Sequence, residues 1–458
     1  MPGGLLVDLY ELNMAASYLR RDMVVPATFS LFVRRLPAHR GFLVAAGLED
    51  CLRFLEGFSF TGDDLAYLRR AQGFDEDTLA AFARLRFTGG VRAVPEGTTV
   101  FAGEPLLEVT APLAEAQLAE TVLLNHLTFQ TSVATKAARC VLAAGGAQLV
   151  DFAFRRTQGI DAGMAVARAS AIAGFSATSN VEAARRYGLT AAGTMAHSFI
   201  EAFSSETAAF TAFAEDFPGK TTFLVDTYDT EQGVRAAIEV ARRLGLPGPV
   251  GIRLDSGDLA GLARMARRML DDAGLPDARI FASGSLDEYA IAALVAGRAP
   301  IDAYGVGTRM GVSADAPYLD SAYKLVSYDG RPVMKLSPGK VTEPGAKQVY
   351  RGSDGDVLAL SDEPAPPGGQ PLLTTVMRAG RRLAAAEPLA AAQRRCAASL
   401  SWLPPGARLL RAPAEVPVMV SPRLAAQRDQ LAAQLARRPA GDPPTGAGAD
   451  DAAADQET

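Results

Sequence analysis

Residues 148–156 read Gln148-Leu149-Val150-Asp151-Phe152-Ala153-Phe154-Arg155-Arg156, a short apolar run that ends in two arginines. Six similar runs follow, each separated from the next by a helical stretch: 174–178, 190–195, 222–225, 250–254, 280–283 and 301–306. Strands that alternate with helices are typical of parallel βαβ units. Seven or eight such units predict an irregular (β/α) barrel, with an open doubly wound sheet as the alternative.

The rest of the chain is organised around this barrel segment, which we place at residues 113–328. Residues 1–112 mix short apolar runs with helical stretches and predict an α+β domain, with short antiparallel strands at 91–100, where Pro95 and Gly97 punctuate the sequence. A helical pattern from Ala114 to about Ala144 leads into the barrel. Residues 329–435, with segments such as 337–340, are expected to pack back on the first domain. The Ala/Asp/Gly/Pro-rich segment 436–458 is predicted to be disordered.

Composition limits the function classes. The 458 residues are 48% hydrophobic and carry a net charge of −5, which favours a large globular protein and gives no general attraction to nucleic acid or to an anionic membrane. Cys51, Cys140 and Cys396 are far apart and show no metal-ligand spacing, so neither a disulfide framework nor a zinc site is indicated. No apolar run is long enough to span a bilayer. We expect a soluble cytoplasmic enzyme.

In a barrel the carboxyl ends of the strands form the active face, so the residues that follow each run are the candidates for chemistry. They are unusually polar: Arg155-Arg156, Ser179-Asn180, His197-Ser198, Asp226, Asp255, Gly284-Ser285 and Gly307-Thr308. Two arginines, two carboxylates, glycine turns and a histidine on one rim suit a substrate that carries phosphates and hydroxyls. Taken singly, each glycine turn is better explained as a tight strand-to-helix connection that needs glycine for its backbone angles.

Two features of the rim carry most of this interpretation. Arg253 and Asp255 are two residues apart and therefore point to the same side of a strand. They could form a structural ion pair, or the arginine could hold a phosphate while the aspartate accepts ribose hydroxyls. Of the three histidines, His39 lies in a predicted loop and His126 in the long helix, whereas His197 lies at the rim and could act as base, nucleophile or ligand.

The chain resembles the nicotinate phosphoribosyltransferase family through six motifs in order. They are Asp8-Leu9-Tyr10, Arg35-Leu36-Pro37 with Arg40-Gly41-Phe42, residues 151–156, residues 193–198, residues 253–258 and residues 305–308. The resemblance implies a type II phosphoribosyltransferase fold, with a domain built from both chain ends, working as a homodimer. It also implies the substrates nicotinate and phosphoribosyl pyrophosphate, with ATP as co-substrate and Mg²⁺ on the pyrophosphate.

The resemblance further implies roles for individual residues. Phe152 and Tyr10 of the partner subunit would sandwich the pyridine ring, and ATP would phosphorylate His197. Substrate contacts are expected from Arg155, Thr178, Ser179, Ser198, Arg253, Asp255, Gly284, Ser285, Gly307 and Thr308. Asp226, at the next strand end, could orient the other ring nitrogen of His197. No protein metal ligand is assigned.

The choice of base is argued from charge. The related nicotinamide enzyme carries an aspartate where this chain has Ser179, after Thr178, and an aspartate would repel the carboxylate of nicotinate. Hydroxyl groups, together with Arg253, suit nicotinate. The alternatives are a phosphoribosyltransferase for nicotinamide or another pyridine, a catalytically silent nucleotide-binding paralogue, and an unrelated barrel lyase or isomerase, which would more often place a lysine at a strand end.

Overall fold

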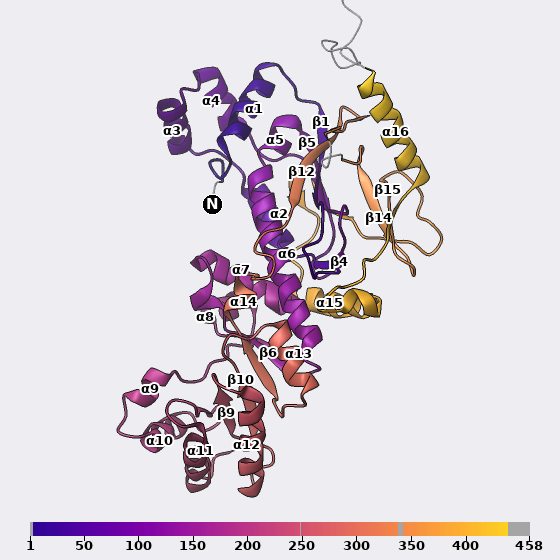
Figure 1. Ribbon diagram of the computed structural model, residues 1–458. Helices are drawn as coiled ribbons and strands as arrows, with labels where there is room; N and C mark the ends of the chain where they lie inside the picture. The colour runs from indigo at the N-terminus through magenta and orange to yellow at the C-terminus, as the bar shows by residue number, and fades with distance from the viewer. Residues whose placement is uncertain (1–2, 248, 338–341, 438–458) are drawn as a thin grey trace, which may run out of the picture.

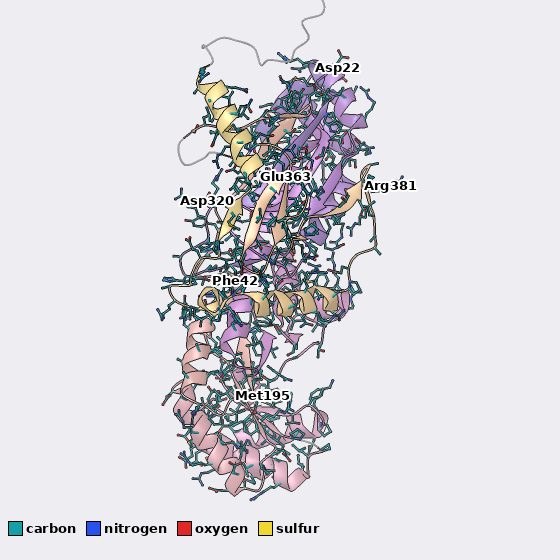
Figure 2. The ribbon with its side chains drawn as sticks, turned by 90° about the vertical axis from the view of Figure 1, so that its right-hand side faces the viewer. Asp22, Phe42, Met195, Asp320, Glu363 and Arg381 are labelled. Carbon is teal, nitrogen blue, oxygen red and sulfur yellow. The ribbon has the colours of Figure 1, made fainter. Side chains whose placement is uncertain are left out.

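The computed structural model describes residues 3–247, 249–337 and 342–437, arranged as two halves (Figure 1). One half contains the parallel sheet and its helices, and the other is built mainly from antiparallel strands. The view turned by 90° shows the same separation, with Met195 inside the parallel half and Asp22 and Arg381 in the antiparallel half (Figure 2). The chain is therefore mixed α/β, with the predicted parallel βα segment joined to a second domain.

The parallel sheet has six strands in the order β7-β6-β11-β10-β9-β8. Their bounds are β6 (Gln148–Asp151), β7 (Ala177–Thr178), β8 (Thr222–Leu224), β9 (Gly251–Leu254), β10 (Arg279–Ala282) and β11 (Ala303–Val306). Every neighbouring pair is parallel. Six of the seven apolar runs are thus strands, and their carboxyl ends lie at one edge of the sheet.

The third apolar run, 190–195, was predicted as a strand and forms only an isolated parallel bridge between Ala191 and Thr178. Three of its six residues are Ala191, Ala192 and Gly193, and the run has no Val, Ile or aromatic side chain of the kind that packs well in a sheet. In the described part of the chain, the hydrogen-bonded ladder therefore ends at β7 and β8. This departure makes the βα segment more open than a regular eight-stranded barrel.

Helices follow these strands, the last of them, α14, leading to the antiparallel half, and several begin at a side-chain cap. The connecting helices are η1 (Phe154–Arg156), α7 (Ile160–Ala173), α8 (Val181–Tyr187), α9 (His197–Glu201), α10 (Glu206–Asp216), α11 (Thr230–Leu244), α12 (Leu259–Asp272), α13 (Glu288–Ala296) and α14 (Thr308–Gly311). Asn180, Asp229 and Asp258 each accept a hydrogen bond from a backbone N–H in the first turn of α8, α11 and α12. Some of the polar residues after the strands are therefore helix caps.

The antiparallel half is assembled from both ends of the chain. Its main sheet has the order β13-β12-β1-β5-β3-β17-β18. The bounds are β1 (Pro26–Val33), β3 (Gly90–Ala93), β5 (Pro105–Pro112), β12 (Ser321–Tyr328), β13 (Arg331–Pro332), β17 (Thr374–Arg378) and β18 (Arg381–Arg382). Because β12 pairs with β1, residues 321–328 belong to this sheet, although the predicted barrel segment ran to 328.

Two smaller sheets and further helices complete this half. The smaller sheets are β2 (Leu43–Val44) with β4 (Thr99–Val100), and β16 (Gln370–Pro371), β14 (Lys347–Arg351), β15 (Asp356–Leu360) and β19 (Val418–Val420). The helices are α1 (Leu9–Arg20), α2 (Leu48–Gly57), α3 (Gly62–Gln72), α4 (Glu76–Arg84), α5 (Leu113–Gln117), α15 (Leu389–Trp402), η2 (Pro405–Arg408) and α16 (Pro422–Ala436). Residues 338–341 and 438–458, which include most of the predicted disordered tail, lie outside the described residues.

Helix α6 (Glu120–Ala143) connects the two hydrophobic cores. It corresponds to most of the predicted helix 114–144, whose first turns form the separate helix α5. Leu123 and Leu127 belong to the core of the antiparallel half, and Val133 and Cys140 to the core around the parallel sheet. Among the described residues, no helix is both long and apolar enough to cross a bilayer.

Candidate active site

The guanidinium of Arg253 lies at the centre of the polar edge of the parallel sheet. Arg253 is the third residue of β9 and only 9% exposed. It donates from Nε to Ser283 (2.8 Å), from Nη1 to Thr194 (3.0 Å), and from Nη2 to Asp255 (2.7 Å). One side chain therefore connects the ends of β9 and β10 with the segment before His197.

Asp255 is held in its charged form by this arrangement. Burial by itself raises the pKa of the Asp255 carboxyl, but the hydrogen bond from Ser283 and the charge of Arg253 outweigh burial, so the pKa is lowered. The ion pair that the spacing allowed is present. Because only part of the carboxylate is engaged, Asp255 can still accept a hydrogen bond from a ligand hydroxyl.

His197 begins α9 and faces this carboxylate. Its Nε2 lies 3.9 Å from Asp255 Oδ2, and its Nδ1 lies 3.2 Å from Thr227 Oγ1. The imidazole is 40% exposed and remains accessible to a ligand. The structure thus brings together the histidine, the arginine and the aspartate that sequence analysis placed on one rim.

The expected pairing of Asp226 with His197 is wrong in this structure. Asp226 Oδ2 instead accepts hydrogen bonds from the backbone N–H of Asp255 (2.8 Å) and from the hydroxyl of Ser256 (2.7 Å). The residue that contacts the ring is its neighbour, Thr227. The aspartate turns toward β9 because two donors there satisfy one carboxylate oxygen. Its other oxygen, Oδ1, is buried without a hydrogen-bond partner among the described residues.

Phe152 forms an apolar wall beside this polar group. It follows β6, is 9% exposed, and its ring centroid lies 5.3 Å from the Arg253 guanidinium carbon. A Cβ added at Gly305 would lie 2.7 Å from the Phe152 ring, so only glycine leaves room for it. An aromatic face next to a cation and a carboxylate can accommodate a flat heteroaromatic ring joined to a sugar.

Thr178 supports this wall and does not face an open space. It is 1% exposed and its hydroxyl donates to Asp151 Oδ2 (2.7 Å), while the Ser179 backbone N–H donates to the Asp151 carbonyl. Burial raises the pKa of Asp151, although the hydrogen bonds from Thr178 and Ala153 partly oppose this shift. Of the two residues proposed for base choice, Ser179 is the more accessible.

The predicted glycine turns lie next to the ends of β9 and β6. Gly284 has a φ of +92°, and a Cβ there would lie 1.8 Å from the Asp255 carbonyl oxygen. The following residue, Ser285, also has a positive φ, +53°. At Gly307 a Cβ would lie 2.9 Å from the Phe152 carbonyl oxygen. Gly284, Ser285 and Thr308 are exposed, so these turns can approach a ligand closely.

Three predicted residues do not join the cluster within one chain. Arg155 is exposed on η1 and makes no hydrogen bond or ion pair within the described part of the chain. Ser198 is exposed on α9. Tyr10 is 47% exposed on α1, in the antiparallel half, where burial and the neighbouring Glu120 raise its pKa.

Sequence reasoning missed three residues that hold the site together: Thr194, Thr227 and Ser283. Each stood within or beside a quoted motif. Thr194 lies in the stretch before His197, Thr227 follows Asp226, and Ser283 precedes Gly284. Their neighbours therefore gave a local signal, but only the fold shows that their hydroxyls meet Arg253 and His197.

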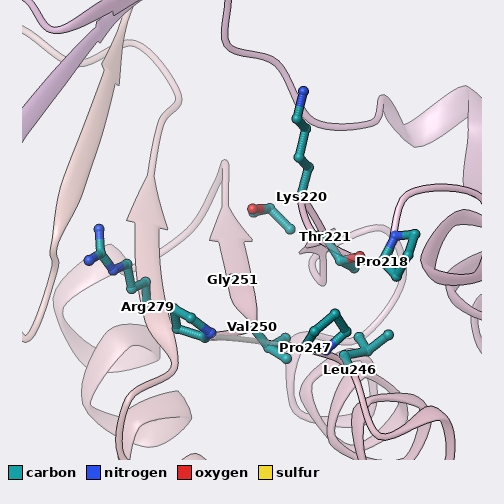
Figure 3. A pocket seen from close by; sticks show the side chains of 11 residues that line it. Pro218, Lys220, Thr221, Leu246, Pro247, Val250, Gly251 and Arg279 are labelled. Atoms are coloured by element: carbon teal, nitrogen blue, oxygen red, sulfur yellow. The ribbon is translucent and has the colours of Figure 1, made fainter.

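A separate hollow of about 170 Å³ lies at the opposite edge of the sheet (Figure 3). It is lined by residues at the amino ends of β8, β9 and β10, including Thr222, Gly251 and Arg279, together with Lys220 and three prolines. It contains none of the predicted site residues. In the described residues no group of three His, Cys, Asp or Glu side chains could hold a metal ion.

Charged groups, close backbone turns and an aromatic face meet at the carboxyl edge of this βα sheet, where they suit a phosphorylated ribose joined to a flat ring, and this arrangement indicates a phosphoribosyltransferase. Comparison of the sequence with known protein families agrees with this class. Residues 133–320 match the quinolinate phosphoribosyl transferase C-terminal domain, and residues 5–128 and 365–428 match the N- and C-terminal domains of nicotinate phosphoribosyltransferase. The chain belongs to the nicotinate phosphoribosyltransferase family.

Individual relatives support this assignment over most of the chain. Nicotinate phosphoribosyltransferase pncB2 of Mycobacterium tuberculosis is 48% identical and covers 94% of both chains. The human nicotinate phosphoribosyltransferase is 35% identical over 94% of this chain and 96% of its own. The crystal structure of the human enzyme superposes with a TM-score of 0.82, at 31% identity, over 93% of this chain and 99% of that chain.

Proposed function

We propose that this chain forms nicotinate mononucleotide and pyrophosphate from nicotinate and phosphoribosyl pyrophosphate, as a step of NAD biosynthesis in the cytoplasm. The observation that carries the proposal is the meeting of Arg253, Asp255 and His197 beside the Phe152 ring. Relatives that carry the name nicotinate phosphoribosyltransferase match nearly the whole chain. The three described cysteines are free and buried, which suits a reducing compartment.

The proposed chemistry needs positioning more than proton transfer. The pyridine nitrogen attacks the anomeric carbon of the ribose, and the bond from that carbon to the pyrophosphate oxygen breaks, so the bonding electrons leave with the pyrophosphate. Positive charge develops on the sugar during this step, and the Asp255 carboxylate next to the ribose stabilises it. The Phe152 ring packs against the pyridine ring and fixes its orientation. The glycine turns allow the phosphate to approach the backbone.

The pyrophosphate leaves with a charge that Mg²⁺ neutralises when it is bound. Because the described residues contain no ready metal cage, the pyrophosphate oxygens and water would supply most of its ligands. We assign the carboxylate group of nicotinate to the hydroxyl of Ser179 and to Arg253. Arg253 has five N–H donors, and the bonds to Ser283, Thr194, Met195 and Asp255 use four of them.

We assign ATP coupling to His197. Its imidazole accepts the γ-phosphoryl group of ATP, ADP leaves, and later hydrolysis of the labile P–N bond releases phosphate. The exposure of the ring, and its position beside the sugar-binding carboxylate, support this role. A homodimer is proposed as well, because α1, which carries Tyr10, and β6, which precedes Phe152, lie in different halves of the chain (Figure 1). A second copy would have to bring Tyr10 to the ring.

One assay tests the function and separates it from the alternatives. The purified protein is incubated with phosphoribosyl pyrophosphate, Mg²⁺ and either nicotinate or nicotinamide, with and without ATP. We expect mononucleotide only from nicotinate and a faster rate with ATP. His197→Ala should lose ATP hydrolysis and its stimulation while keeping slow base transfer. Preference for nicotinamide, or binding of nucleotide without turnover, would contradict the proposal.

A further inference from the structure

An ion pair joins the two glycine turns of the site. Arg309 follows Thr308 in α14, and its Nη1 donates to Asp287 Oδ2 at 2.6 Å. Asp287 lies two residues after Ser285 and directly before α13. The guanidinium therefore spans the gap between the turn after β10 and the turn after β11, which are neighbouring strands in the sheet.

The two carboxylate oxygens of Asp287 bind different partners. Oδ1 accepts hydrogen bonds from the backbone N–H groups of Tyr289 (3.0 Å) and Ala290 (2.9 Å) and so caps α13, while Oδ2 binds Arg309. Burial alone raises the pKa of Asp287, but these hydrogen bonds and the charge of Arg309 lower it overall. The carboxylate is thus charged and fixed in direction at neutral pH.

The first turn of α13 is fixed by ion pairs to α6. Glu288, fully buried, forms ion pairs with Lys136 (2.6 Å) and Arg139 (3.0 Å) of α6. These contacts join α13 to the helix that connects both hydrophobic cores. The position of the Asp287 carboxylate is therefore fixed. A carboxylate in a fixed position can hold the guanidinium of Arg309 in one orientation.

The ion pair of Arg309 contributes little to the stability of the fold. The Arg309 side chain is 50% exposed, whereas that of Asp287 is 10% exposed, and ion pairs with an exposed partner add little to the free energy of unfolding. Guanidinium has five N–H donors, and within the described residues only Nη1 of Arg309 donates a hydrogen bond. The remaining donors of this half-exposed side chain have no hydrogen-bond partner among the described residues and can bind a phosphate in bidentate fashion.

We propose that Arg309, aimed by Asp287, binds the 5′-phosphate of the phosphoribosyl group between the two glycine turns. This inference rests on the proposed function, because it needs a phosphoribosyl ligand at that edge of the sheet. The pyrophosphate of the substrate is the other possible phosphate. Nicotinate mononucleotide carries the 5′-phosphate and no pyrophosphate. Its binding therefore distinguishes a site for the 5′-phosphate from a site for the pyrophosphate.

Binding of nicotinate mononucleotide and of inorganic pyrophosphate, each with Mg²⁺, is measured by isothermal titration calorimetry. Arg309→Gln should weaken nucleotide binding roughly 10- to 100-fold, the effect of losing a charge-assisted hydrogen-bonded pair, and change pyrophosphate binding less than threefold. Arg309→Lys should recover part of the loss, because it keeps the charge without the planar fork. Thermal unfolding should be unchanged.

Asp287→Asn gives a second readout with a defined sign. Asparagine still caps α13 but no longer attracts Arg309. If Asp287 acted only by its charge, its removal would strengthen phosphate binding. A positioning role predicts the opposite, a roughly 3- to 10-fold weaker binding of the nucleotide. Arg235→Gln is the matched control, because Arg235 forms a similar exposed pair with Glu231 on α11 and should bind the nucleotide normally.

Three results would overturn the inference: normal nucleotide binding by Arg309→Gln, a larger loss for pyrophosphate than for the nucleotide, or equal or tighter nucleotide binding by Asp287→Asn. In each case the wild-type protein still binds the nucleotide and forms it, so the proposed function stands. If the wild-type protein neither binds nor forms nicotinate mononucleotide, the proposed function fails, and the role of Arg309 fails with it.

Discussion

The two edges of the parallel sheet are built from the same strands and differ in how their polar groups are used. At the carboxyl edge, Arg253 connects three segments through hydrogen bonds, and Asp255 contacts both Arg253 and Ser283. At the amino edge, a hollow lined by Lys220 and Arg279 contains no carboxylate, and neither cation makes a hydrogen bond or ion pair within the described part of the chain (Figure 3).

This difference shows that a hollow with positive charges is weaker evidence for a site than the convergence of charged groups from several strands. At the carboxyl edge the groups fix one another in direction, and they combine a cation, a carboxylate, a histidine and an aromatic wall. Preorganised polar groups of this kind are what stabilise charge that develops during a reaction. Three predictions test whether function is confined to this edge.

The largest effect is expected from Arg253→Ala. The change removes the central donor, leaves the half-buried Asp255 carboxylate without its ion pair, and should lower kcat/KM about 1000-fold. Arg279→Ala, which removes an arginine from the other edge of the neighbouring strand, is the matched control and should change kcat/KM less than twofold. Comparable losses in steady-state assays of the two variants would erase the distinction between the edges.

Gly284→Ala should lower kcat/KM roughly 100-fold. The added methyl would meet the Asp255 carbonyl oxygen at 1.8 Å, so the turn and Asp255 must both move, and displacements of this size are costly in a positioned site. Gly274→Ala is the control, because Gly274 also has a positive φ, +74°, but has no atom within 4 Å of the added group. It should lose some thermal stability and keep its activity. Equal activity of the two variants would contradict the prediction.

The smallest effect is expected from Thr227→Val. The variant removes the hydroxyl that contacts Nδ1 of His197, and the ATP-stimulated rate should fall about fivefold, corresponding to ~1 kcal/mol, while ATP-independent transfer stays the same. Thr227→Ser keeps a hydroxyl and should recover most of the stimulated rate. A loss of both rates, or no recovery with serine, would show that Thr227 acts only through packing.

Much of the fold was predictable because its signals are local. Six apolar runs became strands of the parallel sheet, and the antiparallel strands near 91–100 formed as β3 and β4. The run at 190–195 failed because small residues can extend without pairing. The assignment of 321–328 to the barrel segment also failed, since a strand's pairing partner lies elsewhere in the chain.

The candidate site was predictable only in part. His197, Arg253 and Asp255 were placed on one rim, and the structure brings them together. The partner of His197 was wrong, since Thr227 and not Asp226 reaches the ring. Thr178 was expected at the substrate and is buried against Asp151. Which of two adjacent polar side chains faces a ligand depends on the exact turn of the backbone, and local sequence does not define it.

The sequence by itself determined the alternation of strands and helices, the polar character of the strand ends and the family to which the chain belongs, because periodicity and motifs are written in neighbouring residues. The tertiary structure alone decided which polar groups meet. Thr194 and Ser283 lie 59 and 30 positions from Arg253, and Asp287 lies 22 from Arg309. The parallel arrangement of β9, β10 and β11 brings the residues after these strands to one edge of the sheet, and the segment before α9 packs against the same edge.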